Sequence, residues 1–217
     1  TEELLKHAGK VVAVEKDERL VSLLNEKFAK EVSSRKLELI HEDVLKFKDL
    51  NPPDGRAGIE KFKVVANIPY YITGALLKKF LVAKNQPSLM VLMVQKEVAE
   101  RIVAKDKKES LLSISVKCYG VPRIVRIVSK KYFSPVPKVD SAVVIIEEIS
   151  RKFFEKIDEE KFFELVRAGF AGKRKQLGGK LKKLGITTQI LDSCDISPAA
   201  RAENISPEKW RCLSKKI

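Results

Sequence analysis

The sequence predicts an α/β fold: an open sheet of mostly parallel strands flanked by helices, with a small all-helical region after it. Short β-branched and apolar runs alternate with stretches of helical spacing through most of the first 120 residues. Two more strands then follow without a long helix between them, which predicts an antiparallel hairpin at the sheet edge. Beyond residue 150 the apolar residues keep only helical spacing.

The first half of the chain supplies two strands and a helix before the central part of the sheet. The β-branched run Val11–Val14 predicts a strand that ends in an acid, Glu15. Apolar residues at helical spacing predict a helix over 18–30, and the run 37–40 predicts the second strand. Residues 51–55, which contain two prolines and a glycine, predict a loop.

The central and last strands are the more apolar ones. Residues 63–66 predict a buried strand, and a helical stretch follows it up to Leu81. The most apolar strand is expected at 89–94, with a helix over 96–104 after it. The two late strands are expected at 123–128 and 141–147.

Length and composition bound the domain organisation and the compartment. A chain of 217 residues accommodates one large domain with a small appendage, and the change of pattern predicts domains at 1–150 and 151–217. No apolar run reaches the ~20 residues that span a bilayer. No secretory signal is visible at the start, so we expect a cytoplasmic protein.

The three cysteines, Cys118, Cys194 and Cys212, are odd in number and lack the spacing of a metal site. We therefore expect free thiols in a reducing compartment and no bound metal.

Positive charge is concentrated in the second half of the chain. The net charge is +14, of which residues 1–95 contribute +3, residues 96–138 contribute +7, residues 139–150 contribute −3 and residues 151–217 contribute +7. A lysine- and glutamate-rich thermophile surface is one explanation. An excess of this size favours a polyanion-binding face beside a small-molecule core, and nucleic acid as partner.

The tetrapeptide Asn67-Ile68-Pro69-Tyr70 directly follows a predicted buried strand. An exocyclic base amine is a poor nucleophile because its lone pair is delocalised into the ring. The Asn67 carbonyl, with the backbone carbonyl of Ile68 or Pro69, can accept the two amine hydrogens, while Pro69 stiffens the backbone and Tyr70 offers a stacking face. A plain β-turn is the alternative, since asparagine and proline are both turn residues.

Two acids follow earlier strands and lie at the edge where ligands bind in open α/β sheets. Glu15 is placed to accept the ribose hydroxyls of a nucleotide cofactor, with Lys16 beside it. Asp43 is placed to accept an adenine amine, and the Val44 N–H to bind a ring nitrogen. Surface acids at strand ends also serve solubility alone, but two of them in register with Asn67 favour a cofactor pocket.

The glycine-rich turn expected before Glu15 is missing from this sequence. The start, Thr1 to Leu5, is typical of the helix after such a turn, with Thr1 as a possible cap. We therefore expect that the chain begins inside the fold, or that the protein has lost the cofactor loop.

Two later segments carry candidate substrate contacts. Phe133 begins a stretch with Pro135 and Pro137, whose stiff backbone can present the ring to a base opposite Tyr70; a core phenylalanine in a rigid loop is the alternative. Lys173-Arg174-Lys175 groups three cations suited to phosphates, or alternatively forms a solvated helix start.

Together these segments resemble the ribosomal small-subunit RNA adenine N6-dimethyltransferases of the bacterial KsgA type. The matching pieces run in order across essentially the whole chain: Glu15, Glu42-Asp43, Asn67–Tyr70, Gln95–Arg101, Phe133–Ser141, Lys173–Leu177 and Arg201–Ile205. The resemblance implies a Rossmann-like methyltransferase sheet and S-adenosylmethionine as donor, with S-adenosylhomocysteine as product.

The same resemblance implies dimethylation of two adjacent adenosines in a hairpin near the 3′ end of the small-subunit rRNA, linked to maturation of the 30S subunit. In these terms Asn67, Pro69, Tyr70 and Phe133 are catalytic, and Asn67 also borders the cofactor. The residues expected to bind RNA are Arg101, Lys138, Lys173, Arg174, Lys175 and Arg201. A monomer is expected.

Two other functions remain open at this point. One is a large-subunit rRNA adenine N6-methyltransferase of the antibiotic-resistance type, which shares the Asn-x-Pro-Tyr site. The other is a non-catalytic RNA-binding assembly factor, which the missing glycine turn would favour.

Overall fold

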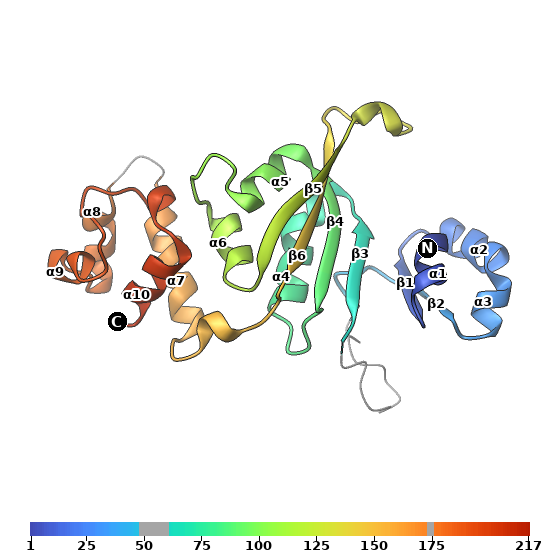
Figure 1. The fold of residues 1–217 in the computed structure, drawn as a ribbon, viewed down its shortest axis with the longest axis horizontal. Coiled ribbons are helices and arrows are strands. Elements are labelled where there is room, and N and C mark those ends of the chain that lie inside the picture. The colour runs from blue at the N-terminus through green and yellow to red at the C-terminus, as the bar shows by residue number, and fades with distance from the viewer. Residues whose placement is uncertain (48–60, 173–175) are drawn as a thin grey trace. The chain divides into compact units, whose positions relative to one another are not determined.

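The computed structural model describes residues 1–47, 61–172 and 176–217. The chain forms two compact units, Thr1–Gly58 and Ile59–Ile217. Figure 1 shows the order of the elements along the chain. The first unit contains α1 (Glu2–His7), β1 (Val11–Glu15), α2 (Glu18–Lys27), α3 (Ala29–Ser33) and β2 (Leu37–His41).

The strands β1 and β2 pair in parallel, from Val11 opposite Leu37 to Glu15 opposite His41. Their carboxyl ends therefore lie side by side. Leu5 and Phe28 pack with Val11 and Leu37 to form the core of this unit. Thr1 occupies the cap position of α1, as predicted, but its side chain makes no capping hydrogen bond.

The helix predicted over 18–30 is interrupted at Phe28. Phe28 has φ −113° and ψ 31°, which lies outside the helical region, and its side chain is buried in the core. The chain resumes as the separate helix α3. The apolar spacing continues across the break, which is why the sequence pattern does not show it.

The second unit begins with β3 (Lys63–Asn67), the short 3₁₀ turn η1 (Tyr70–Ile72) and α4 (Thr73–Leu81). The elements that follow are β4 (Leu89–Gln95), α5 (Lys96–Val103), α6 (Leu111–Lys117), β5 (Val121–Val128), η2 (Lys130–Tyr132) and β6 (Ser141–Glu147). The strand predictions are thus confirmed to within two residues at each end.

The four strands of this unit form one sheet in the order β3-β4-β6-β5. β3 and β4 are parallel, whereas β6 is antiparallel to both β4 and β5. The predicted antiparallel hairpin at the edge is therefore confirmed, and its second strand lies inside, next to β4. The register of the hairpin shifts between Ile124 and Arg126.

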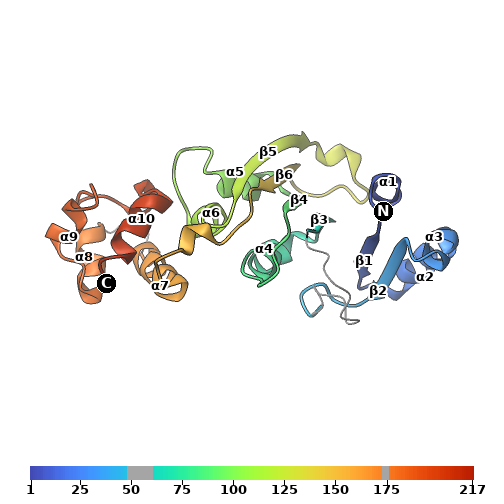
Figure 2. The ribbon, with the colours of Figure 1, turned by 60° about the horizontal axis from the view of Figure 1, so that its bottom comes forward.

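One face of this sheet is buried under helices. Met90, Leu92 and Val94 alternate along β4 and are fully or almost fully buried. The helices α5 and α6 contact the sheet, and Figure 2 shows them with α4 beside it. Alternate burial of apolar side chains against helices is what gives this layer its stability.

Helix α6 has no counterpart among the sequence predictions. Its residues include serines and β-branched side chains, which are weak helix formers. A capping box starts the helix: the Ser110 side chain accepts from the Ser113 N–H, and the Ser113 side chain accepts from the Ser110 N–H. Local capping and tertiary burial of Ile114 outweigh the low propensity.

The last part of the chain is helical, as predicted. Its described elements are η3 (Lys152–Phe154), α7 (Glu159–Phe170), α8 (Leu177–Leu181), η4 (Lys182–Leu184), α9 (Thr188–Asp192), η5 (Ala202–Asn204) and α10 (Pro207–Ser214). An aromatic cluster joins these helices to the end of α6: Tyr119, Phe153, Phe154, Phe162 and Phe163. A domain boundary at residue 150 stays a prediction.

The expectation of three free thiols is wrong for two of the cysteines. Cys194 and Cys212 form a disulfide with an S–S distance of 2.00 Å. They are 18 residues apart in sequence, but α10 returns to the end of α9 and brings their Cα atoms to 5.8 Å. Cys118 is a free, buried thiol, and burial raises its pKa.

Within the described residues, none of the helices is both long and apolar enough to cross a bilayer.

Candidate functional site

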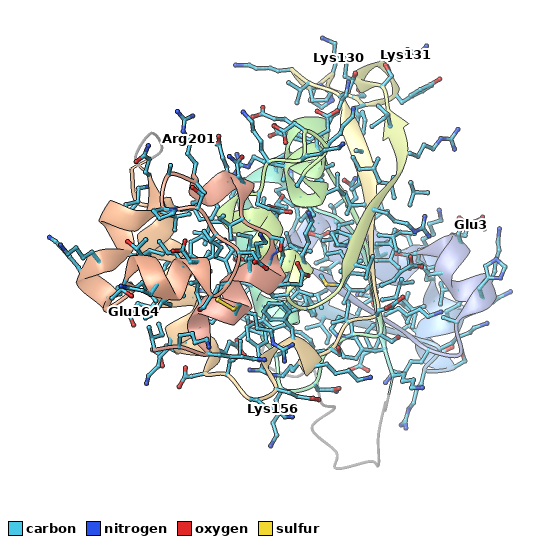
Figure 3. All side chains as sticks on the ribbon, turned by 60° about the vertical axis from the view of Figure 1, so that its left-hand side comes forward. Glu3, Lys130, Lys131, Lys156, Glu164 and Arg201 are labelled. Atoms are coloured by element: carbon cyan, nitrogen blue, oxygen red, sulfur yellow. A yellow bond between two sulfur atoms is a disulfide. The ribbon has the colours of Figure 1, made fainter. Side chains whose placement is uncertain are left out.

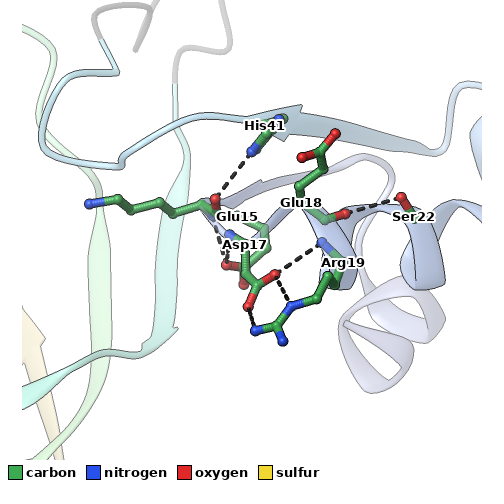
Figure 4. Close-up of polar contacts among 7 residues, drawn as sticks. Glu15, Asp17, Glu18, Arg19, Ser22 and His41 are labelled. Carbon is green, nitrogen blue, oxygen red and sulfur yellow. Dashed lines mark hydrogen bonds and ion pairs between the residues drawn. The ribbon is translucent and has the colours of Figure 1, made fainter.

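In the first unit, the carboxylate of Glu15 lies at the turn that follows β1. Its Oε1 atom accepts hydrogen bonds from the backbone N–H groups of Lys16 at 2.7 Å and Asp17 at 2.8 Å (Figure 4). Its Oε2 atom makes no hydrogen bond to another described residue. The turn thus fixes the carboxylate and leaves one oxygen to accept from ligand hydroxyls.

Asp43 and Lys16 meet across the ends of β2 and β1. The Lys16 ammonium lies 3.1 Å from Asp43 Oδ2, and the Leu45 N–H donates to Asp43 Oδ1 at 2.9 Å. The Leu45 hydrogen bond, and after it that of Lys16, lowers the pKa of Asp43. The carboxylate is therefore ionised, and so an acceptor, at neutral pH.

The backbone of Val44 complements that acceptor. Its N–H makes no hydrogen bond to the described part of the chain. A carboxylate next to a free N–H offers one acceptor and one donor side by side, which matches the amine and a ring nitrogen of adenine. Glu15, Lys16, Asp43 and Val44 are thus brought together as the sequence predicts, and their chemistry fits the adenosine part of S-adenosylmethionine.

Asp17 shapes the same turn. Its side chain accepts from the Arg19 backbone N–H and from the guanidinium at 2.7 and 3.0 Å (Figure 4). The side-chain hydrogen bond from Arg19, followed by the backbone one, lowers the pKa of Asp17 to about 2. Because the folded value lies below the ordinary 3.8, this stabilisation is complete above pH 3.8 and is lost as the pH falls through about 2.

The substitution Arg19→Ala is therefore expected to raise the pKa of Asp17. The backbone N–H of residue 19 remains, so the new value should lie between about 2 and 3.8. A carboxyl-carbon NMR titration measures it directly, and Arg35→Ala is a matched control because Arg35 lies outside this cluster. An unchanged Asp17 titration in Arg19→Ala would contradict the assigned cause.

In the second unit, Asn67 is the last residue of β3 and lies opposite Met93. Its side-chain amide makes no hydrogen bond to another described residue and is exposed. Ile68 is buried and anchors the backbone on the core side. The Asn67 side chain is therefore available to a ligand, at the carboxyl end of a parallel strand.

The two candidate backbone acceptors after Asn67 differ. The Pro69 carbonyl accepts the Ile72 N–H at 3.1 Å in the first turn of η1. The Ile68 carbonyl accepts no hydrogen bond from the described backbone. Each carbonyl has two lone pairs, so the Pro69 carbonyl keeps one of them and the Ile68 carbonyl keeps both.

Tyr70 is tied to the adjacent strand. Its hydroxyl lies 2.9 Å from the Ser141 hydroxyl, and Ser141 is the fully buried first residue of β6. The Thr73 hydroxyl also donates to the Tyr70 carbonyl at 3.0 Å. These bonds fix the ring near Asn67. The sequence shows Ser141 as the first residue of a predicted strand, and its contact with Tyr70 was not predicted.

The change Tyr70→Phe is expected to keep the aromatic ring as a stacking face and to lose the hydrogen bond between the Tyr70 and Ser141 hydroxyls. We expect methyl transfer to fall by less than tenfold, because a neutral hydrogen bond contributes about 1 kcal/mol. The change Tyr70→Ala removes the ring as well and is expected to cost at least tenfold more. Single-turnover rates with saturating RNA measure both, and equal rates for the two variants would contradict stacking.

Phe133 directly follows η2, in the segment between β5 and β6. It is half-buried and has an extended backbone, with φ −111° and ψ 147°. The peptide bond between Ser134 and Pro135 is cis. No ring contact joins Phe133 to Tyr70 in the described structure. The extended segment is as predicted, and the stacking role of Phe133 stays a proposal.

The predicted RNA-binding residues are dispersed. Arg101 is exposed on α5, and Lys138 is exposed in the segment before β6. Arg201 is exposed before η5, with Nη1 4.0 Å from Glu203 Oε1. Lys173, Arg174 and Lys175 lie outside the described residues. No contact joins Arg101, Lys138 and Arg201 within the ranges that the structure covers.

Across residues 1–47, 61–172 and 176–217 no three His, Cys, Asp or Glu side chains gather in a way that would hold a metal ion.

Comparison with known proteins identifies relatives over nearly the whole chain. The ribosomal RNA small subunit methyltransferase A of Dehalococcoides mccartyi strain CBDB1 is 46% identical over 98% of this chain and 73% of its own. The protein of the same name from Fusobacterium nucleatum subsp. nucleatum is 38% identical over 98% of this chain and 80% of its own.

Solved structures show the same fold. A dimethyladenosine transferase from Plasmodium falciparum superposes with a TM-score of 0.81 at 25% identity, covering 97% of this chain and 82% of that one. The 23S rRNA methyltransferase ErmE superposes with a TM-score of 0.75 at 25% identity, covering 99% and 84%. The predicted Rossmann-like methyltransferase sheet is thereby confirmed.

The family model of the ribosomal RNA adenine dimethylases matches residues 1–217, which confirms the resemblance seen in the sequence. This chain belongs to the ribosomal RNA adenine dimethylase family.

Proposed function

We propose that this protein is a small-subunit rRNA adenine N6,N6-dimethyltransferase that uses S-adenosylmethionine. Its targets are two adjacent adenosines in the 3′-terminal hairpin of the 16S rRNA, and it acts during maturation of the 30S subunit. The observation that carries the proposal is the free Asn67 amide at a strand end, next to the open Ile68 carbonyl and the anchored Tyr70 ring.

The donor supplies an electrophilic methyl group on a sulfonium. On the protein side, the free oxygen of Glu15 would accept ribose hydroxyls. Asp43 and the Val44 N–H would hold the adenine, with the Leu45 N–H and the Lys16 ammonium stabilising the Asp43 carboxylate. Asn67 would lie between the donor and the target amine.

The target base needs its amine activated and its ring held. The Asn67 carbonyl oxygen and the Ile68 or Pro69 carbonyl would accept the two amine hydrogens and favour a tetrahedral nitrogen. Tyr70 and Phe133 would stack on the extruded base. Since positioning accounts for the rate in this mechanism, no general base is needed.

Six basic residues outside the donor and base sites would bind the rRNA backbone. We assign this role to Arg101, Lys138, Lys173, Arg174, Lys175 and Arg201, in a chain whose net charge is +14. We further propose a catalytic domain over 1–150, a helical RNA-binding domain over 151–217, and a cytoplasmic monomer that acts on the immature 30S subunit.

A large-subunit rRNA adenine methyltransferase is the nearest alternative, because ErmE has a similar structure. The relatives at 46% and 38% identity bear the small-subunit name, which favours the first proposal. Transfer of a labelled methyl group to purified 30S particles and to naked large-subunit RNA separates the two. We expect label in the 30S particles, and label only in the large-subunit RNA would overturn the choice.

A non-catalytic assembly factor is the second alternative. The open acceptors at Glu15, Asp43 and Asn67 support donor binding instead. Calorimetric titration of S-adenosylmethionine into the protein tests this alternative directly. We expect saturable binding that Asp43→Asn weakens, and a protein that binds RNA without binding the donor would support the assembly factor.

A further inference from the structure

The tip of the hairpin formed by β5 and β6 carries a hollow that the proposed function does not use. β5 is the edge strand of the sheet, so its outer side has no neighbouring strand. The hollow has a volume of about 420 Å³, and we call it the hairpin-tip hollow; its lining residues are Arg126, Ile127, Val128, Ser129, Lys131 and Tyr132.

Positive charge at this tip is not neutralised. Residues 121–140 contain five basic residues and one acid, Asp140. The Asp140 carboxylate accepts the Lys130 N–H at 3.0 Å, and Arg123 forms an ion pair with Glu147 at 2.8 Å. Arg126 and Lys131 have no carboxylate partner among the described residues. Two unpaired cations therefore border the hollow, which favours an anionic ligand.

An aromatic ring lies beside these cations. Tyr132 is 72% exposed, and the Lys131 ammonium lies 5.2 Å from the centroid of its ring. An exposed ring next to cations is the arrangement with which proteins bind single-stranded nucleic acid: bases stack on the ring and phosphates pair with the charges. A ligand with both a flat ring and a phosphate uses the whole surface.

The hollow is connected to the candidate methylation site. Tyr132 immediately precedes Phe133, and Val128 is paired with Ser141, the residue that anchors Tyr70. The Lys130 ammonium also donates to the Lys138 carbonyl at 3.4 Å, which closes the tip. A nucleotide in the hollow would thus contact residues next to Phe133 and next to the strand pair that contains Ser141.

We propose that the hairpin-tip hollow binds the RNA strand next to the target base: Arg126 and Lys131 contact phosphates, and Tyr132 stacks on a flanking base. This inference rests on the proposed function and adds three contacts that determine how the substrate is held. The alternative is that these charges only protect an exposed edge strand from pairing with other chains.

The test compares variants in binding to a synthetic RNA with the sequence of the small-subunit 3′-terminal hairpin. Fluorescence anisotropy gives the dissociation constant over a range of salt concentrations. The matched control is Lys78→Ala with Lys84→Ala, which also removes two exposed positive charges, on α4 and just after it. Figure 3 shows Lys130 and Lys131 together at the tip of the hairpin.

The charge variant and the ring variant are expected to differ in how their RNA binding depends on salt. Arg126→Ala with Lys131→Ala should weaken binding. It should also reduce by about two the slope of the logarithm of the association constant against the logarithm of the salt concentration, because two phosphate contacts are lost. Tyr132→Ala should weaken binding about tenfold with an unchanged slope, because stacking does not release counterions. The control pair should retain the wild-type slope.

Equal salt slopes for the charge variant and the control would overturn the proposal and leave edge protection as the role of these residues. The absence of wild-type binding to the hairpin would also overturn it. Failure of the proposed function gives a different result: no methyl transfer to 30S particles by the wild type, whatever the anisotropy shows.

Discussion

Replacing Asn67 with alanine is expected to lower the rate of methyl transfer by roughly 10²- to 10³-fold, the usual effect of removing one preorganised polar group at a reacting centre. The Asn67 amide is exposed at the end of β3 and makes no hydrogen bond to another described residue. It therefore contributes little to folding and is available to the substrate amine. Single-turnover transfer to 30S particles measures the effect.

The control for this change is Asn25→Ala, which alters an exposed asparagine on α2. We expect Asn25→Ala to transfer methyl groups at the wild-type rate. Both variants should bind the hairpin RNA with wild-type affinity, because Asn67 acts on the amine and not on phosphates. A rate for Asn67→Ala within tenfold of wild type would remove Asn67 from the catalytic role.

Replacing Trp210 with alanine is expected to have the largest effect on stability, about 3–5 kcal/mol. Trp210 on α10 is fully buried, and its ring lies 6.3 Å from that of Phe170 on α7. Gly169 accommodates this ring: a Cβ atom at residue 169 would lie 2.2 Å from Trp210 Cη2. The urea-induced unfolding transition measured by circular dichroism tests this value.

A double-mutant cycle makes this prediction specific. Gly169→Ala is expected to destabilise the wild type by about 1–3 kcal/mol through overpacking. In a Trp210→Phe background the same change should cost less, because phenylalanine lacks the outer ring of tryptophan. The Trp210 N–H has no hydrogen-bond partner in the described structure, so Trp210→Phe sacrifices no such bond. Strictly additive effects would contradict direct packing of Gly169 on Trp210.

The strands follow from the sequence because burial in a sheet demands short apolar, β-branched runs. The runs beginning at Val11, Leu37, Lys63 and Leu89 each form a strand close to the predicted residues. Helix α6 was missed because serines and β-branched residues obscure it, and only the cap at Ser110 reveals its start. The break at Phe28 is set by tertiary burial, which local spacing does not encode.

The candidate site could be predicted as a set of residues but not as a set of bonds. The pattern alone places Glu15 and Asp43 at the carboxyl ends of the paired strands β1 and β2, and Asn67 at the carboxyl end of β3. The choice between the Ile68 and Pro69 carbonyls depends on which one the 3₁₀ turn uses, and that is visible only in three dimensions. The Cys194–Cys212 disulfide likewise depends on the return of a distant helix.

The activity that we propose for this protein is methylation of N6 of adenosine in small-subunit rRNA. Mass spectrometry of nucleosides released from 30S particles, after incubation with the protein and S-adenosylmethionine, tests it most directly. We predict N6,N6-dimethyladenosine at two adjacent positions of the 3′-terminal hairpin. Methylation of another base or another atom, or unmodified adenosines in particles that bind the protein, would contradict the proposed activity.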